Sequence, residues 1–297
     1  MRWDQLPRSD NVEDQRGAGP RSFPTGRAGG IGIGTLLVLV LIGWALGINP
    51  AEILSQLGGG SQEQSQPAPR DAQTQAPSDQ MGQFVSAVLG STEAEWKEIF
   101  ARAGKTYEPP TLVMFSGATR SACGFAQAAM GPFYCPNDQK VYLDTAFFQD
   151  LERRFRGCEI GSKSCQFAQA YVITHEVGHH VQNLLGILPK VQRMQQNLDK
   201  SEANQLQVRV ELQADCLAGV WANHSEQEWQ FIEPGDVEAA MQTASAIGDD
   251  RLQRQSQGYV VPDAFTHGSS AQRTRWFMNG LKSGQVESCD TFNSARQ

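Results

Sequence analysis

The sequence predicts an α+β fold, in which a mostly helical domain with a small sheet is preceded by a single transmembrane helix. Three observations lead to this prediction. An uncharged run occupies 31–48, stretches of β-strand character are confined to 111–143, and a helical spacing of apolar residues continues from 144 towards the end of the chain. The 297 residues are enough for one sizeable domain beside these shorter segments.

Residues 1–30 are predicted to form a disordered cytoplasmic tail. They are polar, with Gly and Pro scattered among them, and they contain five arginines and no lysine. Such a segment holds too few apolar side chains to form a core of its own.

The run at 31–48 contains 18 residues without a charge. As a helix it would extend about 27 Å, close to the roughly 30 Å hydrocarbon core of a bilayer. A buried core helix would normally show some polar face, and a cleaved signal peptide would not carry a 30-residue charged region without an A-x-A site. We therefore expect a transmembrane helix at 31–48, followed by a flexible linker at 49–80 that is rich in Gly, Ser, Gln and Pro.

The arginines predict the orientation of this span. All five precede it, and the next basic residue is Arg70. Basic flanks stay inside, so the N-terminus is expected to be cytoplasmic and the domain at 81–297 periplasmic or extracellular. Thiols oxidise there, and six cysteines fit three disulfides. Fifteen pairings are possible, and proximity and elimination favour Cys123 with Cys135, Cys158 with Cys165, and Cys216 with Cys289.

The overall charge excludes one class of partner. Lys and Arg number 25 against 32 Asp and Glu, which gives a net charge of -7. This balance offers no means of holding a phosphate backbone, so no nucleic-acid partner is expected.

The first part of the domain alternates helix and strand. A helix is expected at 84–103, split in two by the Gly-Ser-Thr sequence at 90–92. A strand follows at 111–115, and a hairpin at 131–143 turns at Pro136-Asn137-Asp138. After Asp144 the pattern is helical.

A helix expected at 164–188 carries the motif H-E-V-G-H at 175–179. His175 and His179 are four residues apart, so on a helix both imidazoles face one way, and Glu176 lies beside them. Two neutral nitrogen ligands with a nearby carboxylate are what a zinc-activated water needs. The alternative is a helix with ordinary, partly buried histidines. His180 is expected to point elsewhere and either to support a ligand from behind or to have a structural role.

A catalytic zinc site needs a third protein ligand. The next predicted helix, 201–223, contains Glu211 and Asp215, again four residues apart on a face that is otherwise apolar. Buried carboxylates need a cation or strong hydrogen bonds. Glu211 is therefore the expected third ligand, and Asp215 the acceptor that fixes the tautomer of a ligand imidazole. The alternative is a surface helix whose acidic residues face water.

These motifs resemble those of known families. H-E-V-G-H-H followed by E-L-Q-A-D resembles the gluzincin pattern of thermolysin-like and HtpX-like peptidases. More narrowly, nearly the whole chain resembles the bacterial YpfJ-type neutral zinc metallopeptidases. The motifs that carry this resemblance are M-R-W, S-D-N-V-E-D, G-P-F-Y-C-P, V-E-L-Q-A-D-C-L-A-G-V-W, G-D-D-R-L-Q and V-P-D-A-F-T-H-G. The resemblance implies a zincin-like peptidase domain on one membrane anchor. Cys158 and Cys165 are not general in that family.

The stretch F-T-H-G-S-S at 265–270, with Arg273, resembles a T-H-P-S-x-x-x-R stretch of HtpX-like peptidases, although Gly268 replaces the proline. The resemblance implies that His267 stabilises the oxyanion of the tetrahedral intermediate. The alternative is a histidine at a helix start, with Thr266 or Ser269 as N-cap.

The sequence thus favours a membrane-anchored zinc peptidase that acts on a protein or peptide, and we expect it to be an endopeptidase. Zn²⁺ held by His175, His179 and Glu211 would activate water, and Glu176 would carry the proton. Two alternatives stay open. One is an envelope scaffold with a structural zinc and Gln-rich contact surfaces, and the other is hydrolysis of a non-peptide amide. No oligomeric state is predicted.

Overall fold

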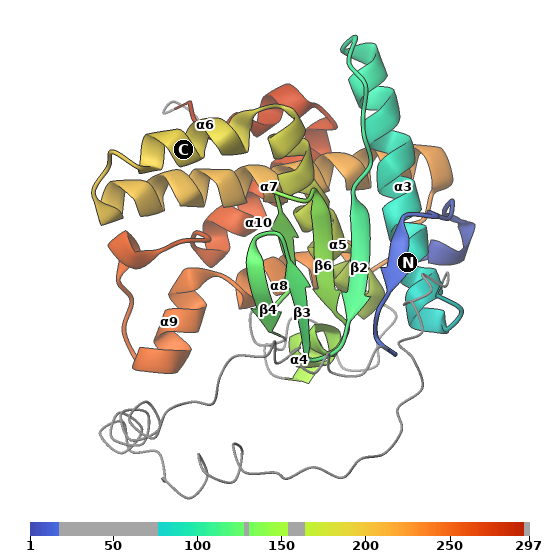
Figure 1. Ribbon diagram of the computed structural model, residues 1–297, viewed down its shortest axis with the longest axis horizontal. Coiled ribbons are helices and arrows are strands. Elements are labelled where there is room, and N and C mark those ends of the chain that lie inside the picture. Colours follow the sequence, from blue (N-terminus) through green and yellow to red (C-terminus); the bar gives the residue numbers. More distant parts are fainter. Residues whose placement is uncertain (18–76, 128–130, 154–163, 294–297) are drawn as a thin grey trace, which may run out of the picture. The chain divides into compact units, whose positions relative to one another are not determined.

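The computed structural model describes residues 1–17, 77–127, 131–153 and 164–293, which form a mostly helical α+β arrangement with a small mixed sheet (Figure 1). The predicted α+β class is confirmed. The elements in chain order are η1 (Trp3–Gln5), β1 (Val12–Asp14), α3 (Gln80–Arg102), β2 (Thr111–Phe115), β3 (Ala118–Ser121), β4 (Gly124–Gln127), β5 (Phe133–Cys135), β6 (Lys140–Asp144), α4 (Ala146–Arg153), α5 (Ser164–Leu184), α6 (Ile187–Gln195), α7 (Lys200–Trp229), α8 (Asp236–Ala246), α9 (Asp249–Gln257), η3 (Pro262–Ala264), α10 (Ser270–Ser283) and η4 (Val286–Cys289).

The main sheet has the strand order β1-β2-β6-β5. β1 and β6 pair with β2 in parallel, and β5 pairs with β6 in an antiparallel hairpin. The strand predicted at 111–115 and the hairpin at 131–143 are therefore confirmed. β2 is almost wholly apolar because both of its faces are covered: Leu112 and Met114 join the main core, while Val113 and Phe115 pack in a second cluster on the other face.

The N-terminal residues form part of this sheet, so the expectation of a loose tail at 1–30 is wrong for residues 1–17. β1 pairs with β2 in register, with Val12 opposite Leu112. Ser9 exchanges hydrogen bonds with Ser86 of α3, and Met1, Leu6 and Val12 are buried in the main core. The compact unit comprises 1–18 and 74–297, not 81–297 alone.

α3 is one helix, so the predicted break at 90–92 is also wrong. The hydroxyls of Ser91 and Thr92 donate hydrogen bonds to the carbonyl oxygens of Val88 and Leu89 in the preceding turn, so both polar side chains are accommodated within the helix. A side chain at Gly90 would lie 2.5 Å from the carbonyl oxygen of Pro7. The small residues that suggested a break instead make room for the N-terminal segment.

This packing overturns the expected topology. A cytoplasmic N-terminus and an exported domain could not share the β1–β2 hydrogen bonds. Among the described helices, none combines the length and hydropathy of a membrane span, and the predicted span at 31–48 lies outside the described residues, as does most of the linker at 49–80.

Protease sites inserted on either side of 31–48 test the corrected topology. A tobacco etch virus protease site placed at 20–28 and one placed at 60–68 are expected to be cut together, or protected together, in spheroplasts, because both adjoin one folded unit. Immunoblotting of the fragments is the measurement. Cleavage of only one site would restore the single-pass arrangement with opposed ends.

The helices are packed closely where the site is built. α5 ends at Leu184, earlier than the predicted 188, because Gly186 has a left-handed φ of 75° and starts α6. α7 runs further than the predicted 201–223, from an Asp199/Glu202 capping box to Trp229. It crosses α10 at Gly280, where a Cβ would lie 1.9 Å from the carbonyl oxygen of Cys216.

Two of the three predicted disulfides are present: Cys123–Cys135 and Cys216–Cys289. The first ties the β3–β4 hairpin to β5, and the second ties α7 to η4. Cys158, the predicted partner of Cys165, lies outside the described residues.

Candidate metal centre

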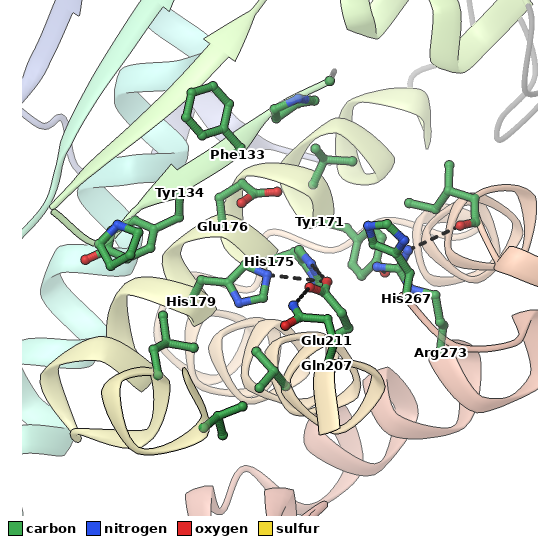
Figure 2. Close-up of a pocket in the computed structure, with 18 of the residues that line it drawn as sticks. Phe133, Tyr134, Tyr171, His175, Glu176, His179, Gln207, Glu211, His267 and Arg273 are labelled. Carbon is green, nitrogen blue, oxygen red and sulfur yellow. Dashed lines mark hydrogen bonds and ion pairs between the residues drawn. The ribbon is translucent and has the colours of Figure 1, made fainter. Parts of the chain in front are cut away.

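A pocket of about 580 Å³ lies between β5, α5, α6, α7 and the segment that leads into α10 (Figure 2). Its wall includes most of the residues that the sequence singled out. His175, Glu176, His179, Glu211 and His267 all line it.

The H-E-V-G-H motif lies on α5, as predicted. The rings of His175 and His179 are one helical turn apart, with centroids separated by 4.8 Å. Glu176 is 8% exposed, and Figure 2 shows its carboxylate on the side of the histidines nearer to Phe133 of β5.

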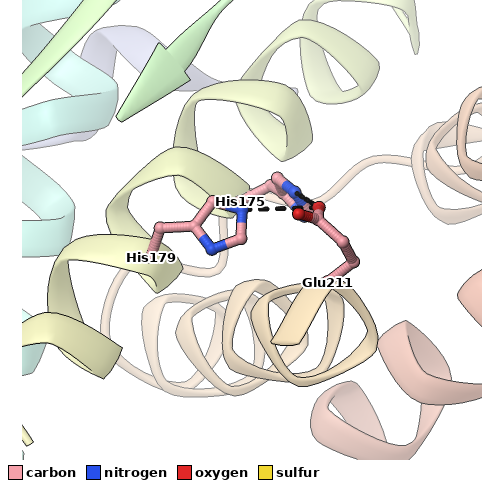
Figure 3. Close-up of side chains that lie close together, drawn as sticks. All are labelled: His175, His179 and Glu211. Atoms are coloured by element: carbon pink, nitrogen blue, oxygen red, sulfur yellow. Dashed lines mark hydrogen bonds and ion pairs between the residues drawn. The ribbon is translucent and has the colours of Figure 1, made fainter. Parts of the chain in front are cut away.

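Glu211 of α7 completes the cluster (Figure 3). Its Oε2 lies 3.2 Å from Nε2 of His175 and 3.4 Å from Nε2 of His179. Its Oε1 accepts a hydrogen bond of 2.8 Å from Gln207. All three candidate ligand atoms lie within 4.8 Å of one another.

Gly178 allows α7 to approach the motif. A Cβ at this position would lie 3.0 Å from the carbonyl oxygen of Ala214 and 3.1 Å from its Cα. A glycine inside the motif thus brings the helix that carries Glu211 close to both histidines.

Asp215 of α7 lies next to His175. Its Oδ1 accepts from Nδ1 of His175 at 2.9 Å, which turns Nε2 towards Glu211. The same carboxylate accepts the Tyr171 hydroxyl and two hydrogen bonds of 2.9 Å from Arg273. Asp215 is fully buried, so these donors supply the compensation that its charge requires.

The carboxylates make this part of the pocket favourable for positive charge. Burial opposes protonation of His175, but the charge and hydrogen bonds of Asp215 and Glu211 outweigh it and raise the pKa of His175 to about 10. Burial likewise opposes the charge of His179, and Glu211 raises its pKa above the ordinary value. A divalent cation fits such a site, because both Nε2 atoms and one carboxylate oxygen face the same point.

His267 is held at the edge of the pocket by Asp249. Oδ2 of Asp249 accepts the backbone N–H groups of Thr266, His267 and Gly268 at 2.6 to 3.0 Å. The Nδ1 of His267 lies 3.4 Å from Oδ1 of the same carboxylate. Ser269, not Thr266, is the N-cap of α10. Figure 2 shows His267 beyond His175 and Glu211, on the side away from His179.

Comparisons with known proteins agree with these motifs. The family model described as "Putative neutral zinc metallopeptidase" matches residues 1–292. The chain belongs to this family. It is 46% identical over 306 residues to YpfJ of Escherichia coli K12, covering 99% of this chain and all of the relative. It is 40% identical over 263 residues to Rv2575 of Mycobacterium tuberculosis H37Rv, covering 84% and 85% of the two chains. No solved structure matches the chain.

In this family member, His180 points away from the cluster, as predicted. Its Nε2 donates to the carbonyl oxygen of Glu108 at 2.7 Å, and its Nδ1 lies 3.1 Å from the hydroxyl of Tyr134 in β5. Burial lowers the pKa of His180, which favours the neutral form of the ring. It joins α5 to the strand that borders the pocket.

The sequence did not predict three of the polar partners of the site. Tyr171 and Gln207 lie one turn before His175 and Glu211, at helical spacings that could have indicated them. Arg273 is 58 residues from Asp215, and only the family resemblance drew attention to it.

Proposed function

We propose that the protein is a zinc peptidase that hydrolyses internal peptide bonds of a protein or peptide substrate. The observation that carries the proposal is the convergence of His175 Nε2, His179 Nε2 and Glu211 Oε2 on one point in the wall of an open pocket, beside Glu176. Membership of a zinc metallopeptidase family supports it.

His175, His179 and Glu211 would hold the zinc ion, with Asp215 fixing the first imidazole. Bound there, zinc supplies Lewis acidity and lowers the pKa of a coordinated water. Glu176 accepts the proton of the attacking water and later delivers it to the leaving amine. His267, held by Asp249, donates a hydrogen bond to the oxyanion that develops on the scissile carbonyl.

The substrate is proposed to lie along β5. This strand is at the edge of the described sheet, since it pairs only with β6 there, and Phe133 and Tyr134 line the pocket. An extended peptide can add to such an edge through main-chain hydrogen bonds. The arrangement of an edge strand above a helix with two histidines supports a zincin-like organisation.

The charges in the pocket favour an endopeptidase. An exopeptidase commonly holds the charged free end of its substrate with a side chain of opposite charge. Among the described lining residues, the charged groups outside the metal cluster are Glu176, His267 and Arg273, and Arg273 is paired with Asp215. The walls next to the cluster are apolar or carry neutral glutamines, such as Gln192 and Gln195.

A structural zinc in a scaffold protein fits less well. Such sites normally have four protein ligands. Within the part of the chain that the structure describes, the cluster has three His, Cys, Asp or Glu members, and it faces an open pocket. The glutamines that suggested contact surfaces include Gln192, Gln195 and Gln207, which line this pocket.

The disulfides support a location for the domain in an oxidising compartment. We propose attachment to the membrane through 31–48, with residues 1–17 on the same side as the domain because they share its sheet.

Metal removal tests the proposed function. The purified full-length protein is expected to contain one equivalent of zinc by elemental mass spectrometry and to cleave members of a peptide library. A chelator should abolish cleavage, and one equivalent of zinc should restore it. Cleavage that continues at the same rate in protein shown to be free of metal would contradict the proposal.

A further inference from the structure

The two histidines of the cluster have different kinds of hydrogen-bond partner at Nδ1. The Nδ1 of His175 faces the carboxylate of Asp215, whereas the Nδ1 of His179 lies 2.8 Å from Oε1 of Gln182. Gln182 is fully buried and lies three residues after His179, on the same face of α5. A neutral amide thus occupies the place that a carboxylate holds at the first histidine.

The orientation of this amide is fixed by a backbone carbonyl. The Nε2 of Gln182 lies 2.8 Å from the carbonyl oxygen of Val210, which can only accept a hydrogen bond. The NH₂ group must therefore face Val210, and the amide oxygen must face His179. Because that oxygen is only an acceptor, Nδ1 of His179 must carry a proton, which leaves the lone pair of Nε2 for the cluster.

Gln213 of α7 accepts a hydrogen bond from the second N–H of the Gln182 amide. The Nε2 of Gln213 donates to the carbonyl oxygen of Cys289 at 3.0 Å, so its Oε1 accepts from Gln182 at 2.9 Å. Cys289 is fixed in turn by its disulfide with Cys216. Both amides thus have a single possible orientation, set by two main-chain carbonyls.

A carboxylate could not replace the amide here. At position 182 it would face two acceptor oxygens, those of Val210 and Gln213, with no proton to donate. It would also add an uncompensated buried charge, whereas Asp215 has Arg273 as its counter-ion.

We propose that Gln182, anchored by Gln213, is a positioning residue that fixes the tautomer and ring orientation of His179 for metal binding. This inference rests on the proposed zinc site. Partners of metal-ligating imidazoles typically contribute 10- to 100-fold to metal affinity.

The test compares variants of the full-length protein by zinc affinity, measured by competition with a chromophoric chelator. Gln182→Met keeps the side-chain length but neither accepts from His179 nor donates to Val210, and it is expected to bind zinc about 10- to 100-fold more weakly. Gln213→Met leaves Gln182 at His179 and removes one of its two anchors, while the bond to Val210 stays, so a smaller loss is expected. Asn183→Ala is the matched control, because Asn183 is the next residue on α5 and its amide donates to Tyr134 instead.

Proton NMR of the zinc-loaded protein provides a readout specific to positioning. Slowly exchanging imidazole N–H resonances of His175 and His179 are expected for the unaltered protein and for Asn183→Ala, beside that of the buried His180, and the His179 resonance should be lost in Gln182→Met. Thermal unfolding of each variant identifies any that fail to fold, and Gln213→Met then carries the affinity test.

The outcomes separate the two proposals. Stoichiometric zinc in the unaltered protein, with equal affinity and an unchanged His179 resonance in Gln182→Met, would overturn the role of Gln182 alone. An unaltered protein that binds no zinc would overturn the proposed function and this inference together.

Discussion

Replacing Glu176 with glutamine is expected to lower kcat/KM for peptide cleavage by about 10³-fold while zinc stays bound. The substitution keeps the shape of the side chain but removes the group that accepts a proton, and positioned acid–base groups contribute about 10² to 10⁴ in rate. Glu176 lies beside the cluster and is not one of its three candidate ligands, so the metal content should not change. Steady-state kinetics and elemental analysis of the same preparation are the measurements.

The control for this experiment is Glu228→Gln. Glu228 is an exposed residue of α7, near the end of the helix that carries Glu211, and it does not line the pocket. Its replacement removes the same charge and should leave kcat/KM unchanged. If Glu176→Gln retained zinc and full activity, Glu176 would have no part in the proton transfer.

Replacing Arg273 with methionine is expected to reduce the free energy of unfolding by about 3–5 kcal/mol. Arg273 is 3% exposed and donates two hydrogen bonds of 2.9 Å to Asp215, which has no exposed surface. Without the guanidinium, the carboxylate would remain buried with too little compensation. Chemical denaturation followed by circular dichroism measures the change.

Two further variants sharpen this prediction. Arg275→Met is the matched control, since Arg275 lies two residues further along α10 and is exposed, and it should be close to neutral. The double variant Arg273→Met/Asp215→Asn removes both charges and should be more stable than Arg273→Met. A loss in Arg273→Met no larger than that in Arg275→Met would show that the buried pair does not stabilise the fold.

The elements that the sequence predicted correctly depend on local geometry. The i, i+4 spacing places His175 and His179 on one face of α5, and the apolar surroundings of Glu211 and Asp215 indicated a buried face of α7. β2 and the β5–β6 hairpin were recognisable because a compact apolar run and a Pro-Asn-Asp turn are local signals.

The features that the sequence did not predict depend on contacts between distant segments. Strand β1 is three residues long within an arginine-rich, polar stretch, so its pairing with β2 has no periodic signal. The β3–β4 hairpin was not predicted either. Gly90 suggested a helix break because nothing local shows that Pro7 packs against it. The contacts of Asp215 with Arg273 and of Gln182 with Gln213 were not predicted for the same reason, since the two members of each pair lie on different helices.

The position of β1 also bears on the order in which the protein folds. Residues 1–17 are synthesised before their partners, which lie on α3, on β2 and, for Arg2, at the carbonyl oxygen of Phe231. Contacts so far apart in sequence form slowly, because a long loop must close before they form. This segment must therefore wait for residues more than two hundred positions later, and until its partners are all in place the surface of α3 around Gly90 and the edge of β2 are not fully covered.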